Sequence, residues 1–220
     1  MSTASGEIYQ PLVLSRSWNQ PLQLACKRGL DVLLSAFLLV LVAPLLLVLA
    51  LAVKLTSTGP IFYRWQVVGK NGRPFLGYKI RSMVMNADEL KSQLEDRNEM
   101  SGPVFKIEGD PRITPIGSWM RRYSLDELPQ LYNVLKGDMA LVGPRPPLRT
   151  EYERFTEYQK QKLVVKPGIT CLWQISGRNK VSDFNEWVRL DLEYIRRWSI
   201  WLDLRILMRT LGAVVSGSGK

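Results

Sequence analysis

The chain has 220 residues, of which 46% are hydrophobic, and its 30 Lys and Arg against 20 Asp and Glu give a formal charge of +10. It contains no histidine, so no imidazole can serve as a base or metal ligand. The two cysteines, Cys26 and Cys171, are too far apart in sequence to indicate a disulfide framework or a zinc site. The excess of cations indicates an anionic partner: phospholipid headgroups, nucleic acid or phosphorylated substrates.

The N-terminal part combines a polar tail with one long apolar run. The tail, residues 1–25, begins rich in polar residues without periodicity, and we expect it to be flexible. Residues 32–53 follow with Ser35 as the only polar side chain. At about 1.5 Å per residue, a helix of this length just crosses a hydrocarbon core of roughly 30 Å. We therefore predict a membrane segment over residues 26–56, and one domain with its own core over residues 57–220.

Pro44 and the charged flanks leave two topologies open for the membrane segment. Pro44 removes a backbone donor beyond the middle of the run and favours a kink. Lys27 and Arg28 precede the run and Lys54 follows it, so both flanks are basic. The positive-inside rule then places both flanks on the cytoplasmic side, which a straight span cannot satisfy. From the residues alone, a re-entrant helix hairpin turning at Pro44 and a kinked spanning helix are equal alternatives, and no cleaved signal peptide is expected.

The remaining chain predicts a β-hairpin followed mainly by helices. Aromatic and β-branched residues at 61–69 and 74–80 flank Lys70-Asn71-Gly72, a typical hairpin turn. Helices are expected over residues 86–97, 113–123, 124–136, 148–165, 183–198 and 198–215, with loops at 101–114, 139–147 and 166–179. The last helix mixes Trp and Leu with Arg, which fits either a helix at the bilayer surface or one packed into the core.

Two adjacent carboxylates, Asp126 and Glu127, are the first candidates for chemistry. Ser124 and Glu127 could form a capping box, although Pro129 would then fall at a costly helical position; with Asp126 as N-cap, Pro129 falls in the tolerated first turn. Either way, both carboxylates would stand at the positive end of a helix dipole. One could attack phosphorus while the other helps to bind Mg²⁺. A purely structural cap is the alternative.

The second candidate is Arg145. Three prolines surround it in the run Gly143-Pro144-Arg145-Pro146-Pro147, so the arginine is held in rigid, extended backbone. Its fork of donors matches a diphosphate. The alternative is a proline-rich connector without a binding role.

Five segments in order along the chain resemble the monotopic phosphoglycosyl transferases, a group of bacterial sugar transferases. They are KRGLD at 27–31, TGPIFYRWQVVGKNGRPFLGYKIRSM at 58–83, DPRIT at 110–114, SLDELPQLYNVLKGDMALVGPRP at 124–146 and KPGITCLWQISGRN at 166–179. The resemblance implies transfer of a sugar 1-phosphate from a UDP-sugar to polyprenyl (undecaprenyl) phosphate with release of UMP, the initiating step of exopolysaccharide, capsule or O-antigen assembly.

The same resemblance implies an α+β, mostly α, fold. A re-entrant membrane helix hairpin broken at Pro44 would carry a small catalytic domain with a β-hairpin and interfacial amphipathic helices, on the cytoplasmic face of the bacterial inner membrane. The expected partners are the UDP-sugar, polyprenyl phosphate and membrane lipids, and not nucleic acid; a homodimer stays open. A non-catalytic basic membrane adaptor that binds polyanions is the alternative function.

Roles for individual residues also follow from the resemblance. Asp126 would be the nucleophile that forms a phosphosugar-aspartyl intermediate, and Glu127 would join it at Mg²⁺. Lys79 and Arg81 would bind phosphate, and the substrate site would also include Arg145, Pro144 and Arg178. Three positions depart from the family pattern: Val67 replaces an arginine, Cys171 replaces a glycine, and Ala43 precedes Pro44 where serine is frequent.

Overall fold

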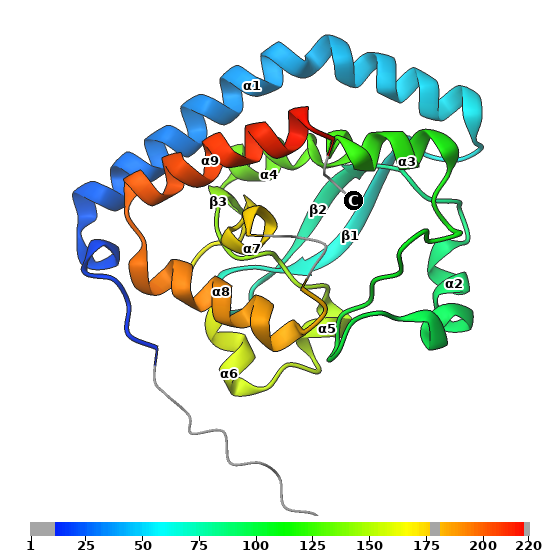
Figure 1. Cartoon of the computed structure of the whole chain (residues 1–220). Helices are drawn as coiled ribbons and strands as arrows, with labels where there is room; N and C mark the ends of the chain where they lie inside the picture. Colours follow the sequence, from blue (N-terminus) through cyan, green and yellow to red (C-terminus); the bar gives the residue numbers. More distant parts are fainter. Residues whose placement is uncertain (1–11, 177–180, 218–220) are drawn as a thin grey trace, which may run out of the picture.

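The computed structural model describes residues 12–176 and 181–217, and one long helix arches over the rest of the chain (Figure 1). With η for 3₁₀ helices, the elements are η1 (Arg16–Asn19), α1 (Pro21–Thr56), β1 (Phe62–Val68), η2 (Lys70–Gly72), β2 (Pro74–Ile80), α2 (Ala87–Lys91), η3 (Ser92–Arg97), α3 (Pro115–Arg122), η4 (Leu125–Glu127), α4 (Gln130–Lys136), β3 (Ala140–Val142), α5 (Arg149–Tyr152), α6 (Glu157–Lys160), η5 (Gln161–Val164), β4 (Gly168–Thr170), α7 (Leu172–Ile175), α8 (Phe184–Arg197) and α9 (Ile200–Val215).

Helix α1 contains the predicted membrane segment. It has 36 residues and, by length and composition, is the one described helix that is apolar enough to cross a membrane. Pro44 lies inside the helix without dividing it, and α1 bends as it passes over the domain (Figure 1). Its middle exposes large apolar side chains, including Leu33, Phe37, Val40, Leu47 and Val48. The apolar helix is confirmed, whereas the re-entrant hairpin stays a prediction.

Both ends of α1 are attached to the same domain. Near its start, Lys27 Nζ lies 2.6 Å from Asp203 Oδ2 of α9, and Arg28 donates to two backbone carbonyls of α4 at 2.6 and 2.8 Å. Near its end, Leu49 and Val53 are buried against the end of β2 and helix α3. The domain therefore touches α1 before and after Pro44. In the middle of the helix one face, with Leu34, Leu38, Leu39 and Val42, packs against the main core, and the opposite face is exposed.

The predicted hairpin is confirmed. Strands β1 and β2 pair antiparallel from Phe62↔Ile80 to Val68↔Pro74. Asn71 (φ 55°) and Gly72 (φ 77°) both adopt left-handed backbone, which explains why an Asn-Gly pair occupies this turn. Helix α4 is tied to β2 by Asn133, whose side chain donates to the carbonyl of Leu76 at 2.7 Å.

A second, smaller sheet lies where loops were expected. Strands β3 and β4 pair in parallel, within the segments 139–147 and 166–179. Each has three residues, too few for a periodic pattern to be recognised. The two chains approach closely because Gly143 and Gly168 face each other, and a Cβ on either glycine would overlap the opposite backbone. Around this sheet, helices α4 and α8 form the main core with the stacked rings of Trp173 and Trp187.

Three of the predicted helices are wrong in extent. Segment 148–165 divides into α5, α6 and η5, because Thr156 and Gln159 form a capping box that starts a new helix. Segment 86–97 divides into α2 and η3, and Asn86 gives it no side-chain cap hydrogen bond. Segment 124–136 divides into η4 and α4. Helices α3, α8 and α9 match their predictions.

Residues 12–20 differ from the flexible tail that we expected. The ring of Trp18 stacks on Trp198 at 4.0 Å, and Trp18 Nε1 donates to the carbonyl of Ile195 at 2.9 Å. Ser15 Oγ donates to the carbonyl of Trp198 at 2.9 Å. These contacts fix the chain against the end of α8 just before α1 begins at Pro21.

Candidate active site

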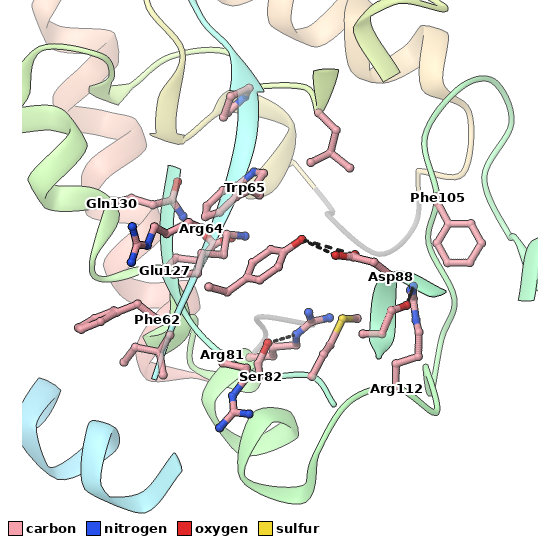
Figure 2. Close-up of a pocket in the computed structure, with 18 of the residues that line it drawn as sticks. Phe62, Arg64, Trp65, Arg81, Ser82, Asp88, Phe105, Arg112, Glu127 and Gln130 are labelled. Carbon is pink, nitrogen blue, oxygen red and sulfur yellow. Dashed lines mark hydrogen bonds and ion pairs between the residues drawn. The ribbon is translucent and has the colours of Figure 1, made fainter. Parts of the chain in front are cut away.

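One cavity of about 530 Å³ lies beside the β1–β2 hairpin (Figure 2). Its walls come from the hairpin, residues 82–91, the end of α3, η4, and the loops next to β3 and β4. Of the predicted site residues, it brings together Lys79, Arg81, Glu127 and Arg145. Cations outnumber carboxylates in the lining: Arg64, Lys91, Arg112 and Arg121 join Lys79, Arg81 and Arg145, against Asp88, Glu127 and Glu151.

The most direct contact between predicted site residues joins Lys79 and Glu127. Lys79 Nζ lies 2.7 Å from Glu127 Oε1, and the two side chains are 21% and 13% exposed. The pair connects the end of strand β2 with the 3₁₀ turn η4. Asp126, the adjacent residue, is buried and stands behind the wall, since the lining within the described chain does not include it.

The backbone around Asp126 and Glu127 corrects the sequence-based expectation. Ser124 precedes η4 in left-handed backbone with φ 54°, and its side chain makes no capping hydrogen bond to that helix. Asp126 and Glu127 lie within η4, and α4 begins only after Pro129. Both predicted N-cap arrangements are therefore wrong. Instead, Ser124 forms a left-handed turn between α3 and η4, and Glu127 of η4 contacts Lys79 of β2.

Arg121 is a cation of the site that the sequence did not single out. Its Nε donates to Ser82 Oγ at 2.9 Å, and it lines the cavity. Burial lowers the pKa of its guanidinium, while the nearby carboxylates of Asp126, Asp110 and Glu127 act in the opposite direction. The only indication in the sequence was that Arg121 lies near the end of a basic helix, close to Ser124. A basic helix end does not show which of its side chains points into a cavity.

Arg81 binds backbone carbonyls and also lines the cavity. Its guanidinium donates to the carbonyls of Ser57, at 3.1 Å, and Thr58, both directly after α1. The side chain is buried and still lines the cavity. Arg81 therefore connects the end of the membrane helix to the end of β2, and phosphate binding by this residue stays a prediction.

Arg145 is placed by the small sheet. The amide of Gly168 donates to the carbonyl of Pro144 at 3.0 Å, and the amide of Gly143 donates to Thr170 at 3.0 Å. The loop is thereby fixed on both sides of β4, and half-buried Arg145 reaches the cavity while Pro144 is buried. Arg178 lies outside the described residues.

The three positions that depart from the family pattern, Ala43, Val67 and Cys171, do not line the cavity. Val67 is buried and pairs with Leu148 through a backbone bridge. Cys171 is buried beside Asp191, and burial raises the pKa of its thiol far above the usual range, so it is an inert core residue. Pro44 lies in α1, outside the lining of the cavity.

The donor atoms fit a divalent cation that protein and substrate hold together. Within residues 12–176 and 181–217, no group of three or more Asp, Glu or Cys side chains gathers into a ligand cluster. Asp126 and Glu127 are adjacent in sequence; Glu127 lines the cavity, and Asp126 is buried behind its wall. Mg²⁺ is commonly bound by one or two carboxylates together with substrate phosphates and water. The carboxylate pair fits this arrangement and does not fit an all-protein cage.

Comparison with known proteins gives consistent matches over nearly the whole chain. The chain is 46% identical over 213 residues to the galactosyl transferase CpsE of Streptococcus agalactiae, covering 97% of this chain and 47% of that protein. It is 43% identical over 197 residues to the undecaprenyl-phosphate galactose phosphotransferase of Salmonella typhimurium, covering 88% and 41%. It is 38% identical over 205 residues to the exopolysaccharide production protein ExoY of Rhizobium meliloti, covering 91% and 90%.

The chain thus spans about half the length of the first two relatives and most of the third. The profile of the family described as bacterial sugar transferase matches residues 22–217, from the start of α1 to just beyond the end of α9. The chain therefore belongs to the bacterial sugar transferase family.

Proposed function

We propose that the protein transfers a sugar 1-phosphate from a UDP-sugar to polyprenyl phosphate and releases UMP. The observation that carries the proposal is the Lys79–Glu127 pair at 2.7 Å, next to Asp126 and at the wall of a cation-lined cavity. The names of two relatives, an undecaprenyl-phosphate galactose phosphotransferase and a UDP-glucose:undecaprenyl-phosphate glucose-1-phosphate transferase, describe reactions of this class.

The transfer proceeds in two displacements at the same phosphorus atom. A carboxylate oxygen of Asp126 attacks the phosphorus that carries the sugar, the diphosphate bond breaks, and UMP leaves with the electron pair. An oxygen of polyprenyl phosphate then attacks this phosphorus and displaces Asp126, which returns to a free carboxylate. Polyprenyl phosphate is already anionic, so the reaction needs no histidine base. Attack by Asp126 requires its buried carboxylate to become accessible to the donor phosphate.

The neighbouring charges offset the negative charge that accumulates as UMP leaves. Asp126 and Glu127 would hold Mg²⁺, which supplies charge neutralisation at the phosphates when bound. Lys79 and Arg145 reach the cavity from the hairpin and from the loop after β3. Arginine suits a diphosphate because its donors form a planar fork, and lysine acts as a point charge.

The membrane helix explains how a soluble donor and a lipid acceptor meet. Both ends of α1 contact one domain, which fits a re-entrant helix that turns near Pro44 with both flanks on the cytoplasmic side. Helix α9 exposes Trp201, Met208, Leu211 and Val215, which fits a helix at the bilayer surface. The protein would thus act at the inner bacterial membrane, at the start of exopolysaccharide, capsule or O-antigen assembly.

UMP release from a panel of UDP-sugars, with polyprenyl phosphate and Mg²⁺, tests this function. We expect release from at least one donor, its abolition by Asp126→Asn and by EDTA, and a reduction of at least about 100-fold by Glu127→Gln, the size expected for loss of one preorganised electrostatic group. Glu157→Gln, on the exposed face of α6, is the matched control and keeps full activity. Wild-type protein that releases no UMP, but binds anionic vesicles with steep salt dependence, would instead support the membrane adaptor.

A further inference from the structure

The hairpin places an indole ring directly beneath the cation of the candidate site. Trp65 of β1 is the cross-strand partner of Gly77 of β2, and Tyr63 is the partner of Lys79. Residues two apart on a strand share a face, so Trp65 and Lys79 lie diagonally across the same face of the hairpin. Both line the cavity, as does Glu127, and Figure 2 labels Trp65 and Glu127 among its walls.

Gly77 makes room for the ring. A Cβ added at position 77 would lie 2.9 Å from Cζ2 of Trp65, closer than side-chain carbons approach, so the indole rests directly on the glycine backbone. The indole ring is also nearly parallel to the ring of Tyr63, with centroids 6.0 Å apart and 8° between the planes. Tyr63 is fixed in turn by its hydroxyl, which lies 3.3 Å from Asp88 Oδ2. The indole is therefore in contact with the Gly77 backbone and lies beside a tyrosine whose hydroxyl is hydrogen-bonded.

This seated ring reaches Lys79. The Nζ of Lys79 lies 4.9 Å from the centroid of Trp65, within the range of a cation–π contact, and 2.7 Å from Glu127 Oε1. A lysine has a flexible four-carbon chain, which loses substantial rotamer entropy when it is fixed. A metal ion on Glu127 would compete with the ammonium for the charge of that carboxylate and weaken the ion pair. The contact with the ring would persist, because its π face is not a metal ligand.

We propose that Trp65, seated on Gly77, is a positioning residue that keeps Lys79 at the reacting phosphate. The inference rests on the proposed phosphosugar transfer and adds a residue to its machinery. It predicts that Trp65 affects the rate only by positioning Lys79, because Lys79 is the predicted site residue that the ring contacts.

A double-mutant cycle with Trp65→Leu and Lys79→Met tests the proposal through UMP release. We expect Trp65→Leu to lower kcat about 3- to 30-fold, the range of a cation–π contact, and to have no further effect once Lys79→Met is present. Trp65→Phe keeps a π face and recovers most of the activity. Gly77→Ala displaces the ring and lowers kcat as Trp65→Leu does. Tyr132→Leu is the control. The ring of Tyr132 packs against Tyr78 of β2 but does not line the cavity, so this variant keeps full activity.

Melting temperatures of the wild type, Trp65→Leu, Lys79→Met and the double variant test the contact between Trp65 and Lys79 without any substrate. We expect the Tm shifts of Trp65→Leu and Lys79→Met to be non-additive by about 1–4 °C. Additive effects on kcat, or Trp65→Phe as inactive as Trp65→Leu, would overturn the positioning role while UMP release by the wild type keeps the transferase. Absence of UMP release from the wild type would overturn the transferase and this role with it, and additive Tm shifts would overturn the contact itself.

Discussion

At the scale of single residues, Asp110 holds one cation of the cavity wall in place. Its carboxylate accepts from Arg112 Nε at 2.9 Å and from the terminal nitrogen at 2.6 Å, and Arg112 also lies over the ring of Phe105 at 5.0 Å. Burial works to raise the pKa of Asp110, but the hydrogen bonds and charge of Arg112 outweigh it and hold the pKa below its usual range. The ion pair between Asp110 and Arg112 therefore stabilises the folded state.

Asp110→Asn is expected to lower the free energy of unfolding at pH 7 by about 2 kcal/mol, because hydrogen bonds to charged groups contribute in this range. A depressed pKa in the folded state means that the contribution is full above the unfolded pKa of about 3.9 and is lost as pH falls through the folded value. The Tm gap between wild type and variant should thus be constant from pH 7 to 5 and shrink below about pH 4.

The exposed Asp96→Asn of η3 is the control for this series, with an equal loss of charge and no effect on Tm at pH 7. A gap for Asp110→Asn that widens as the pH falls would contradict the ion pair.

Part of the candidate site could be predicted from the sequence. Asp126 and Glu127 were marked by their adjacency, and Arg145 by its prolines, because these features are local. The contact of Lys79 with Glu127 joins residues 48 positions apart. It depends on how the hairpin packs on η4, and the periodicity of the sequence carries no information about that packing. Arg121 was missed for the same reason, and Arg81 turned out to bind the backbone after α1.

At the scale of elements, the helices and strands that the sequence predicts are those that are long or have a clear turn or capping signal. The 36-residue α1, the hairpin and helices α8 and α9 have patterns long enough to recognise. Strands β3 and β4 have three residues each and pair between distant segments, so only tertiary contact defines them. The helix expected at 148–165 failed because the capping signal at Thr156 was not recognised.

Close packing of α3 on the end of the hairpin gives a prediction at this scale. A Cβ on Gly117 would overlap the backbone carbonyl of Ser82, which already accepts from the amide of Thr114 at 3.1 Å. We expect Gly117→Ala to destabilise the protein by about 1–3 kcal/mol, the usual effect of overpacking, in thermal or urea unfolding. Gly212→Ala in α9 is the matched control, since nothing lies within 4 Å of its new Cβ. The control should stabilise by up to about 1 kcal/mol, and equal effects of the two changes would contradict the packing.

At the scale of the whole molecule, α1 and the domain are joined as one unit. Lys27 and Arg28 attach the beginning of α1 to α9 and α4, and Leu49 and Val53 attach its end to β2 and α3. A domain of this size on one side of a bilayer cannot hold both ends of a helix that crosses the bilayer. The geometry therefore favours the re-entrant arrangement that we propose.

Cysteine labelling in membrane vesicles tests this arrangement. The natural Cys26 is exposed before the apolar run, and Leu55, 76% exposed, follows it. We expect a membrane-impermeant maleimide to modify Cys26, and Leu55→Cys in a Cys26→Ser background, only in inside-out vesicles. Buried Cys171 gives no background. Labelling of one position in inside-out vesicles and of the other in right-side-out vesicles would instead indicate a spanning helix.

The central claim, a phosphosugar carried on Asp126, is tested most directly by trapping it. The purified protein is mixed with Mg²⁺ and a UDP-sugar labelled at the phosphorus next to the sugar, without acceptor, and quenched within seconds. We predict up to one label per protein with an equal amount of UMP, loss of the label on addition of polyprenyl phosphate, and no label on Asp126→Asn. UMP release that requires the acceptor from the start, or a label that persists on Asp126→Asn, would contradict the account.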